Sequence, residues 1–241
     1  MEAVAICQLK NVTKTYASAH GSQEIFSDLT LELPLEGITV LVGRSGCGKT
    51  TLLRLLSDLE KPDIGEISFT RMGKKYQPKV GMVFQESRLL PWLTVAENIM
   101  LSRSRWQEAD VLPFLDMVGL EHSTLHMKPA SLSGGMAHRV AIARALVYAP
   151  DLLLMDEPFA ALDYFTRMAL QQKVIEIQQQ TNTAVIFVTH NVDEALLLAK
   201  RILVLKKGET PVAFPVTETY PRHLEQSVLV QCKQDILRLL L

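Results

Sequence analysis

The run Gly43–Thr50, GRSGCGKT, carries the clearest chemistry in this chain. It fits the pattern GxxxxGK[ST] and lies between an apolar, β-branched run at 37–42 and leucines at helical spacing over 49–59. In such a loop the backbone N–H groups point at phosphate oxygens, and the helix N-terminus adds partial positive charge. We predict that Lys49 reaches the β- and γ-phosphates of a nucleotide, and that the Thr50 hydroxyl ligates Mg²⁺. The predicted phosphate-binding residues are Gly43, Arg44, Ser45, Gly46, Cys47, Gly48, Lys49, Thr50 and Thr51.

A pair of carboxylates follows the apolar run Leu152–Met155. Parallel strands bind ligands at their carboxyl ends, so Asp156 suits a contact to Mg²⁺, and Glu157 suits a base that takes a proton from an attacking water. The alternative is an acidic cap before a helix. Beside the glycine loop, the pair favours a nucleotide hydrolase.

A second anion site is predicted at Ser133-Gly134-Gly135-Met136, which precedes the helical run AHRVAIARALV. Ser133 suits an N-cap, and the two glycines expose N–H groups. Because the glycine loop already binds the phosphates of its own nucleotide, this second site indicates the nucleotide of another copy of the chain. The alternative is a flexible turn capped by serine.

The elements that position these residues alternate between strand-like and helical stretches. Strands are expected at 4–9, 25–33, 37–42, 65–70, 79–84, 152–156, 183–189 and 201–205, and helices near 49–59, 95–101, 107–118, 133–148, 166–180 and 191–199. Repeated β-α units predict an α/β fold with a mostly parallel sheet. We expect one domain, in which 1–84 and 151–210 form the core, 85–150 form an inserted helical subdomain, and 211–241 form a helical tail.

Composition and charge exclude several other classes of protein. The 241 residues have a net charge of -1, with 48% hydrophobic and 21% charged residues, which excludes a disordered chain and gives no bulk attraction to nucleic acid. No apolar run reaches the roughly 18–20 residues of a membrane span. The three separated cysteines favour a reducing compartment and argue against zinc. Without an export-type leader, the cytoplasm is the expected compartment.

With these motifs in this order, the chain resembles the ATP-binding cassette (ABC) ATPases over nearly its whole length, and Leu132–Met136, LSGGM, resembles their signature sequence. The resemblance implies an antiparallel β subdomain beside the core and gives roles to four more residues. Gln85 resembles the glutamine that meets Mg²⁺ and the attacking water, and His190 resembles the switch histidine at the γ-phosphate. Tyr16 resembles the aromatic that stacks on adenine, and Asp163 matches the family's loop that crosses the dimer interface. Three of these residues have structural alternatives: Gln85 as a polar residue at a strand end, His190 as a helix cap, and Tyr16 as a half-buried strand residue.

A finer resemblance, in the run that follows Gln85 and in Met136, is to importers of nitrate, sulfonates, taurine and thiamine-precursor pyrimidines. It implies that the apolar group Leu89, Leu90, Pro91 and Trp92 contacts a helix of a membrane permease. The alternative is that Trp92 plugs the helical subdomain. The departures from that subfamily are His138 in place of glutamine, Ala160 in place of glycine or serine, and Asn191 in place of aspartate.

These features together predict an ATP- and Mg²⁺-dependent ATPase that works as two copies. It would drive a separate permease from the cytoplasmic face of the inner membrane, with an external solute-binding protein as an indirect partner and no nucleic acid. Two alternatives stay open. One is a non-transport ABC ATPase acting on DNA or the ribosome, and the other is a small-molecule kinase built on the same glycine loop.

Overall fold

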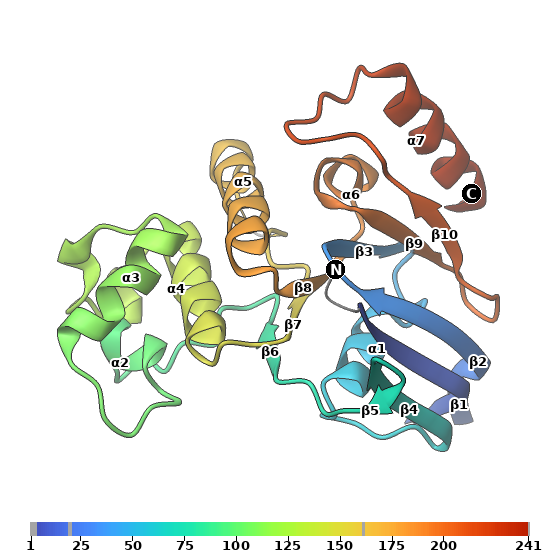
Figure 1. Ribbon diagram of the computed structural model, residues 1–241, viewed down its shortest axis with the longest axis horizontal. Helices are drawn as coiled ribbons and strands as arrows, with labels where there is room; N and C mark the ends of the chain where they lie inside the picture. The colour runs from blue at the N-terminus through green and yellow to red at the C-terminus, as the bar shows by residue number, and fades with distance from the viewer. Residues whose placement is uncertain (1–3, 19–20, 161, 241) are drawn as a thin grey trace. The chain divides into compact units, whose positions relative to one another are not determined.

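The computed structural model describes residues 4–18, 21–160 and 162–240. These residues form two compact units (Figure 1). The terminal unit comprises the residues up to 78 and those from 184 onward, and the middle unit comprises residues 79–183. The predicted subdivision at 84, 150 and 210 stays a prediction.

An antiparallel sheet forms the first part of the terminal unit. Its strands are β1 (Ala5–Ser18), β2 (Gly21–Leu35), β4 (Ile64–Arg71) and β5 (Lys74–Lys75), in the order β2-β1-β4-β5. β1 and β2 are longer than the predicted strands at 4–9 and 25–33. The register shifts between Leu9 and Val12, and Asn11 and Asp28 have positive φ angles, so the strands continue past the point where the alternating pattern ends.

A second set of strands in the terminal unit is mostly parallel. It consists of β3 (Ile38–Gly43), β8 (Ala184–Thr189), β9 (Arg201–Leu205) and the antiparallel β10 (Val212–Pro215). β3 pairs with both β8 and β9, and every residue of β3 and β8 is buried. Continuous apolar runs are typical of strands covered on both faces, which explains why the sequence identified β3 and β8.

Three helices complete the terminal unit, namely α1 (Lys49–Leu56), α6 (Val192–Leu198) and α7 (Ser227–Leu240). α1 begins directly after the glycine loop. α7 packs on α6 and β9 (Figure 1). Its buried side chains are Leu229 and Ile236, and its Lys233 forms an ion pair with Asp193 at 2.5 Å. The expected tail helix is therefore α7.

The middle unit is mainly helical. Its parallel strands β6 (Val80–Val83) and β7 (Leu152–Asp156) adjoin the helices α2 (Val95–Ile99), α3 (Glu108–Val118), α4 (Gly134–Val147) and α5 (Tyr164–Thr181), with short 3-10 turns at His122–Thr124 and Pro129–Ser131. α4 packs against α2 and α3 (Figure 1). Among the described residues, no helix combines the length and apolarity needed to span a membrane.

Candidate nucleotide site

The glycine loop connects β3 to α1, as the sequence predicted. Two of its glycines are required by close approaches. A Cβ atom on Gly43 would lie 2.4 Å from the carbonyl oxygen of Leu205, and one on Gly48 would lie 2.7 Å from the Phe26 ring. Gly48 also has a φ angle of 102°, in the region that favours glycine. The loop can therefore adopt this shape only with glycine at both positions.

Lys49 is folded back onto the loop. Its side chain is buried, and its Nζ donates to the carbonyl oxygens of Gly43 at 2.8 Å and Arg44 at 3.2 Å. No acidic residue occupies the first turn of α1, and no side chain caps its N-terminus. The ammonium group and the helix N-terminus thus present positive charge at the loop, as a phosphate-binding site requires.

Cys47, inside the loop, does not oppose this charge. Its side chain is buried, and burial raises the pKa of its thiol despite the nearby Lys49 ammonium. A neutral thiol is therefore the expected form at neutral pH, and it places no negative charge beside a bound phosphate.

A hollow of about 310 Å³ adjoins the loop. Arg44, Ser45 and Gly46 line it together with residues beyond β9 and with Leu240 of α7. Its cations are Arg44, Lys206 and Lys207, and its one acidic group, Glu209, is paired with Lys206 at 2.9 Å. The net charge next to the loop is therefore positive, the sign that suits a polyphosphate.

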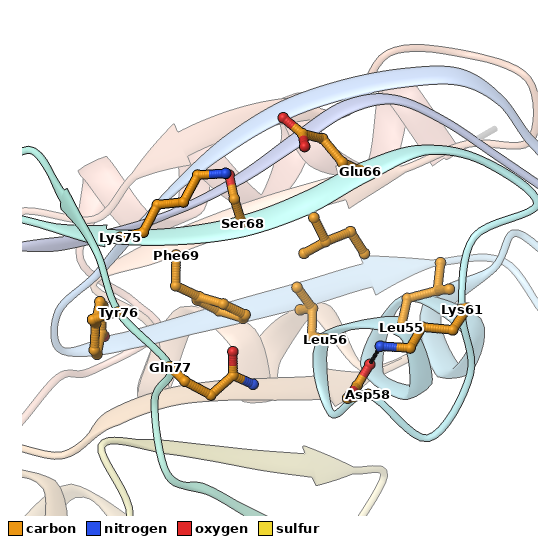
Figure 2. A pocket seen from close by; sticks show the side chains of 11 residues that line it. Leu55, Leu56, Asp58, Lys61, Glu66, Ser68, Phe69, Lys75, Tyr76 and Gln77 are labelled. Carbon is orange, nitrogen blue, oxygen red and sulfur yellow. Dashed lines mark ion pairs between the residues drawn. The ribbon is translucent and has the colours of Figure 1, made fainter.

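A larger hollow, of about 450 Å³, lies at the other end of α1. Figure 2 shows Leu56 and Phe69 facing this space, with the Asp58–Lys61 ion pair at its rim and Gln77 opposite. The residues that line it include none of those predicted to touch the nucleotide. The structure thus separates this hollow from the predicted chemistry.

Tyr16, on β1, lies beside the helix that follows the loop. Its hydroxyl donates to a carboxylate oxygen of Glu60 and also contacts the side chain of Thr51 in α1. Burial and the Glu60 carboxylate raise the pKa of the Tyr16 phenol. The predicted adenine-stacking residue therefore lies next to the phosphate loop in space, although the two are far apart in the sequence.

His190 is placed at the loop by strand register. β8 pairs with β3 so that Thr189 stands opposite Val42, the residue before Gly43. His190 follows Thr189 directly and is exposed, and the Asn191 side chain caps α6 by accepting from Asp193 and Glu194 N–H groups at 2.9 and 3.3 Å. Asn191, and not His190, therefore caps α6.

The carboxylate pair and Gln85 share one edge of the middle unit. β6 and β7 pair with Val83 opposite Met155, so Gln85 and Glu157 both follow the carboxyl ends of adjacent parallel strands. Asp156 ends β7 and is buried, whereas Glu157 is partly exposed and has a positive φ angle of 43°. The two carboxylates thus differ in burial and in backbone conformation, which is compatible with the two different roles predicted for them.

The Ser133 turn begins α4, as predicted. The Ser133 hydroxyl accepts from the Met136 N–H at 3.2 Å, while Gly134 is exposed and Gly135 is buried against Thr166 of α5. Asp163 caps α5 by accepting from the Thr166 N–H at 3.1 Å, and the hydroxyl and N–H of Thr166 hold the pKa of Asp163 below its usual value. Ala161, in the same motif, lies outside the described residues.

The apolar group Leu89–Trp92 lies on the surface. Trp92 is 66% exposed, so the alternative in which it plugs the helical subdomain is wrong. The fully buried side chain of Asn98 fixes the segment from inside. It accepts from the Leu90 N–H at 2.8 Å and donates to the carbonyl oxygens of Leu90 and Leu93 at 3.1 and 3.2 Å.

Three residues in these contacts were not assigned a role from the sequence. Glu60 holds the Tyr16 hydroxyl, Asn98 fixes the Leu89–Trp92 segment, and His138 contacts the carbonyl oxygen of Gln85 at 3.0 Å. Asn98 gave one usable signal, since it is a polar residue at a core position of an apolar helix. The signal for His138 was that it replaces the glutamine usual in the importer subfamily that the sequence resembles.

The Mg²⁺ site predicted at Thr50, Asp156 and Gln85 stays a prediction, because Thr50 lies in the terminal unit and the other two residues lie in the middle unit. Across the described ranges, no group of three or more His, Cys, Asp or Glu side chains is arranged to hold a metal ion. Mg²⁺ in phosphate-transfer sites takes few protein ligands and completes its shell with phosphate and water oxygens. A hydroxyl at Thr50, a carboxylate at Asp156 and an amide at Gln85 are oxygen donors of this kind.

A buried parallel strand, a glycine loop and a lysine at the start of the next helix define a P-loop nucleotide-binding protein. The model of the ABC transporter family matches residues 26–160. The chain belongs to this family, and it is an ATP-binding ATPase.

Curated relatives are similar in sequence to this chain over most of their length. An aliphatic sulfonates import ATP-binding protein of Xanthomonas axonopodis is 39% identical over 226 residues, which cover 93% of this chain and 77% of the relative. A protein of the same name from Shigella sonnei is 39% identical over 232 residues, which cover 95% of this chain and 89% of the relative.

Solved structures give the same result. A dimeric structure of the bacterial ABC transporter cassette MJ0796 has a TM-score of 0.75 and 32% sequence identity, covering 88% of this chain and 100% of that one. The same cassette has been solved as a dimer bound to ADP and phosphate, with 31% identity over the same shares of the two chains. The predicted family, fold class and ATPase activity are confirmed.

Proposed function

We propose that this chain is the ATP-hydrolysing subunit of an importer for a small anionic solute of the sulfonate kind. The proposal is carried by the similarity, over 93% of the chain, to a protein named for aliphatic sulfonate import. The membrane path would belong to a separate permease, with the chain at the cytoplasmic face of the membrane and an external solute-binding protein as an indirect partner. Neither alternative, the non-transport ATPase or the kinase, has comparable support.

In this proposal, the nucleotide is held mainly by the terminal unit. The loop from Gly43 to Thr51 binds the phosphates, and the Lys49 ammonium exchanges its contacts with loop carbonyls for contacts with the β- and γ-phosphates. Tyr16 stacks on the base. Thr50, Asp156 and Gln85 would hold Mg²⁺, which would supply charge neutralisation at the phosphates.

Hydrolysis requires a water activated at the γ-phosphate. Glu157 takes its proton, Gln85 orients it, and His190 donates to the γ-phosphate as negative charge develops there. Ser133, Gly134, Gly135 and Met136 bind the nucleotide of the second copy with the N–H groups of the first turn of α4, and Asp163 lies at the same interface. One chain therefore supplies half of each of two sites.

The permease contact is assigned to Leu89, Leu90, Pro91 and Trp92. The exposed Trp92 provides apolar area for a partner helix, and the Asn98 hydrogen bonds hold the segment in one shape. Replacing Trp92 with Ala should weaken co-purification with the permease. Replacing the other tryptophan, Trp106, should not.

The Glu157→Gln variant tests the ATPase mechanism. With the base removed and the shape kept, the variant should still bind ATP and should accumulate as an ATP-bound dimer on gel filtration, while phosphate release falls by at least about 100-fold. The exposed Glu225→Gln is the matched control and should behave as wild type. Normal turnover by Glu157→Gln would refute the role of Glu157 as the base.

Deletion of the gene tests the importer role. Cells without the chain should lose uptake of a labelled alkanesulfonate, and the wild-type chain should restore it where Glu157→Gln does not. Normal uptake in the deletion strain, or recovery of the tagged chain with ribosomes or DNA instead of a membrane protein, would refute the importer role.

A further inference from the structure

The ring of His138 lies between two backbone carbonyl groups of the middle unit. Its Nδ1 is 2.9 Å from the carbonyl oxygen of Gly134, and its Nε2 is 3.0 Å from the carbonyl oxygen of Gln85. Because a carbonyl oxygen only accepts, a neutral ring donates a hydrogen bond to one of these oxygens and lies in contact with the other, whereas a protonated ring donates to both. The residue is 6% exposed, so solvent is largely excluded from this contact.

A second side chain of α4 holds the residues that follow Gln85. The two terminal nitrogens of Arg144 donate to the carbonyl oxygens of Arg88 at 2.8 Å and Ser87 at 2.9 Å. The Arg88 guanidinium in turn lies 4.0 Å from the centroid of the Phe84 ring. Residues 84–88 therefore form a closed loop whose backbone is attached to α4.

The same helix also carries the predicted anion site. Gly134, the carbonyl partner of His138, lies in the first turn of α4 between Ser133 and the buried Gly135. One rigid ring therefore joins the first turn of α4 to the backbone of Gln85.

We propose that His138 is a positioning residue that holds Gln85 at a fixed place relative to the first turn of α4, so that the parts this chain contributes to the two ATP sites move together. The inference rests on the proposed function, because it takes Gln85 to act on the water and the first turn of α4 to bind the nucleotide of the second copy. In this proposal, His138 itself touches neither the water nor the nucleotide.

The test compares His138 with its neighbour on the same helix in the full-length chain. Arg139 also holds two carbonyl groups, those of Val118 and Gly119 at 3.1 and 2.8 Å, but these lie at the end of α3 and not beside Gln85. His138→Leu fills the space without donating, and Arg139→Ala is the matched loss of a helix anchor. His138→Gln keeps an amide donor, and the shorter His138→Asn does not reach as far.

We expect His138→Leu to lower kcat on the order of ten-fold, since a misplacement of 1 Å in an active site costs up to about 100-fold. The Kd for ATP should stay within about two-fold, because the glycine loop is untouched. His138→Gln should recover most of kcat, and His138→Asn should not. Arg139→Ala should keep kcat within about two-fold, even where its Tm falls as far as that of His138→Leu.

A double-mutant cycle with Gln85 gives the decisive readout. If His138 acts through Gln85, then His138→Leu should have little further effect on kcat in a Gln85→Ala background. Full multiplication of the two effects would overturn the proposal. So would a normal kcat in His138→Leu, or an equal loss of kcat in Arg139→Ala.

Failure of this inference is distinguishable from failure of the proposed function. If the wild-type chain does not hydrolyse ATP, or if Glu157→Gln is as active as wild type, the proposed function is wrong whatever the His138 variants do. Should His138→Leu not fold, the comparison of His138→Gln with His138→Asn decides the question, and equal kcat values in these two variants would overturn the proposal.

Discussion

Replacing Gly135 with Ala should destabilise the middle unit, whereas the same change at Gly134 should not. A Cβ atom on Gly135 would lie 2.5 Å from the Cγ2 of Thr166, where an ordinary carbon–carbon contact is about 3.5–4.0 Å. On Gly134 the nearest atom would be the Cδ2 of Leu162, at 4.0 Å. The two glycines are adjacent in the first turn of α4, so each is the control for the other.

Thr166 cannot easily give way. Threonine is β-branched and stiff at χ1, and the Thr166 hydroxyl and N–H both bond Asp163 at the start of α5. Relief therefore requires the loss of the hydroxyl bond or a separation of the two helices. Overpacking of this kind costs about 1–3 kcal/mol, and Ala gains about 0.8–1 kcal/mol over Gly in a helix.

The expected difference between the two variants is the overpacking term alone, about 1–3 kcal/mol. Gly134→Ala should be slightly more stable than wild type and Gly135→Ala less stable, with Tm values separated by roughly 2–12 °C in a chain of this size. Urea unfolding followed by circular dichroism gives the same comparison. Stability is the appropriate readout, because both glycines belong to the proposed ATP site.

Thr166→Ser supplies the second side of the cycle, since it removes the clashing methyl group and keeps the hydroxyl. The pair Gly135→Ala with Thr166→Ser should recover most of the stability lost in Gly135→Ala. Equal urea midpoints for Gly134→Ala and Gly135→Ala, or no recovery with Thr166→Ser, would show that this contact does not constrain the helix.

Two further predictions concern the segment after Gln85. In urea unfolding, Asn98→Ala should lower the free energy of unfolding by about 2–4 kcal/mol, because the buried amide makes several hydrogen bonds of about 1 kcal/mol each. The control Gln180→Ala, at an exposed position, should change this free energy by less than about 0.5 kcal/mol. The backbone N–H and hydroxyl of Thr94 hold the pKa of Glu97 below its usual value, so its contribution to stability is present above about pH 4.3 and is lost as pH falls through the lower folded value. Urea midpoints measured from pH 7 down to pH 3 should therefore fall less steeply in Glu97→Gln than in wild type, and parallel slopes would contradict this assignment.

The sequence predicted the parts of the site that depend on neighbours in the chain. The boundary between β3 and α1, the cap at Ser133 and the end of β7 at Asp156 are each determined by a few consecutive residues, and each was confirmed. A glycine turn, a capping hydroxyl and a buried apolar run act over about one helical turn, so local patterns contain the information.

The sequence did not reveal the contacts that join distant residues. Tyr16 bonds Glu60 across 44 positions, and His138 meets Gln85 across 53. Such pairs depend on how strands and helices pack, and no local pattern specifies them. The short strands β5 and β10 were also missed, because two to four residues give too little periodicity to recognise.

The backbone at Glu157 shows why two adjacent carboxylates can serve different roles. If the strand continued past Asp156, the Glu157 side chain would point away from that of Asp156. It would then be buried, because both faces of β7 are covered. Instead Glu157 has a φ angle of 43°, which costs a non-glycine residue about 1–2 kcal/mol. The buried Pro158 and Phe159 that follow keep the chain in this turn. The turn leaves Asp156 buried at the strand end and Glu157 partly exposed, which suits the proposed function, in which Asp156 would contact a metal ion and Glu157 a water.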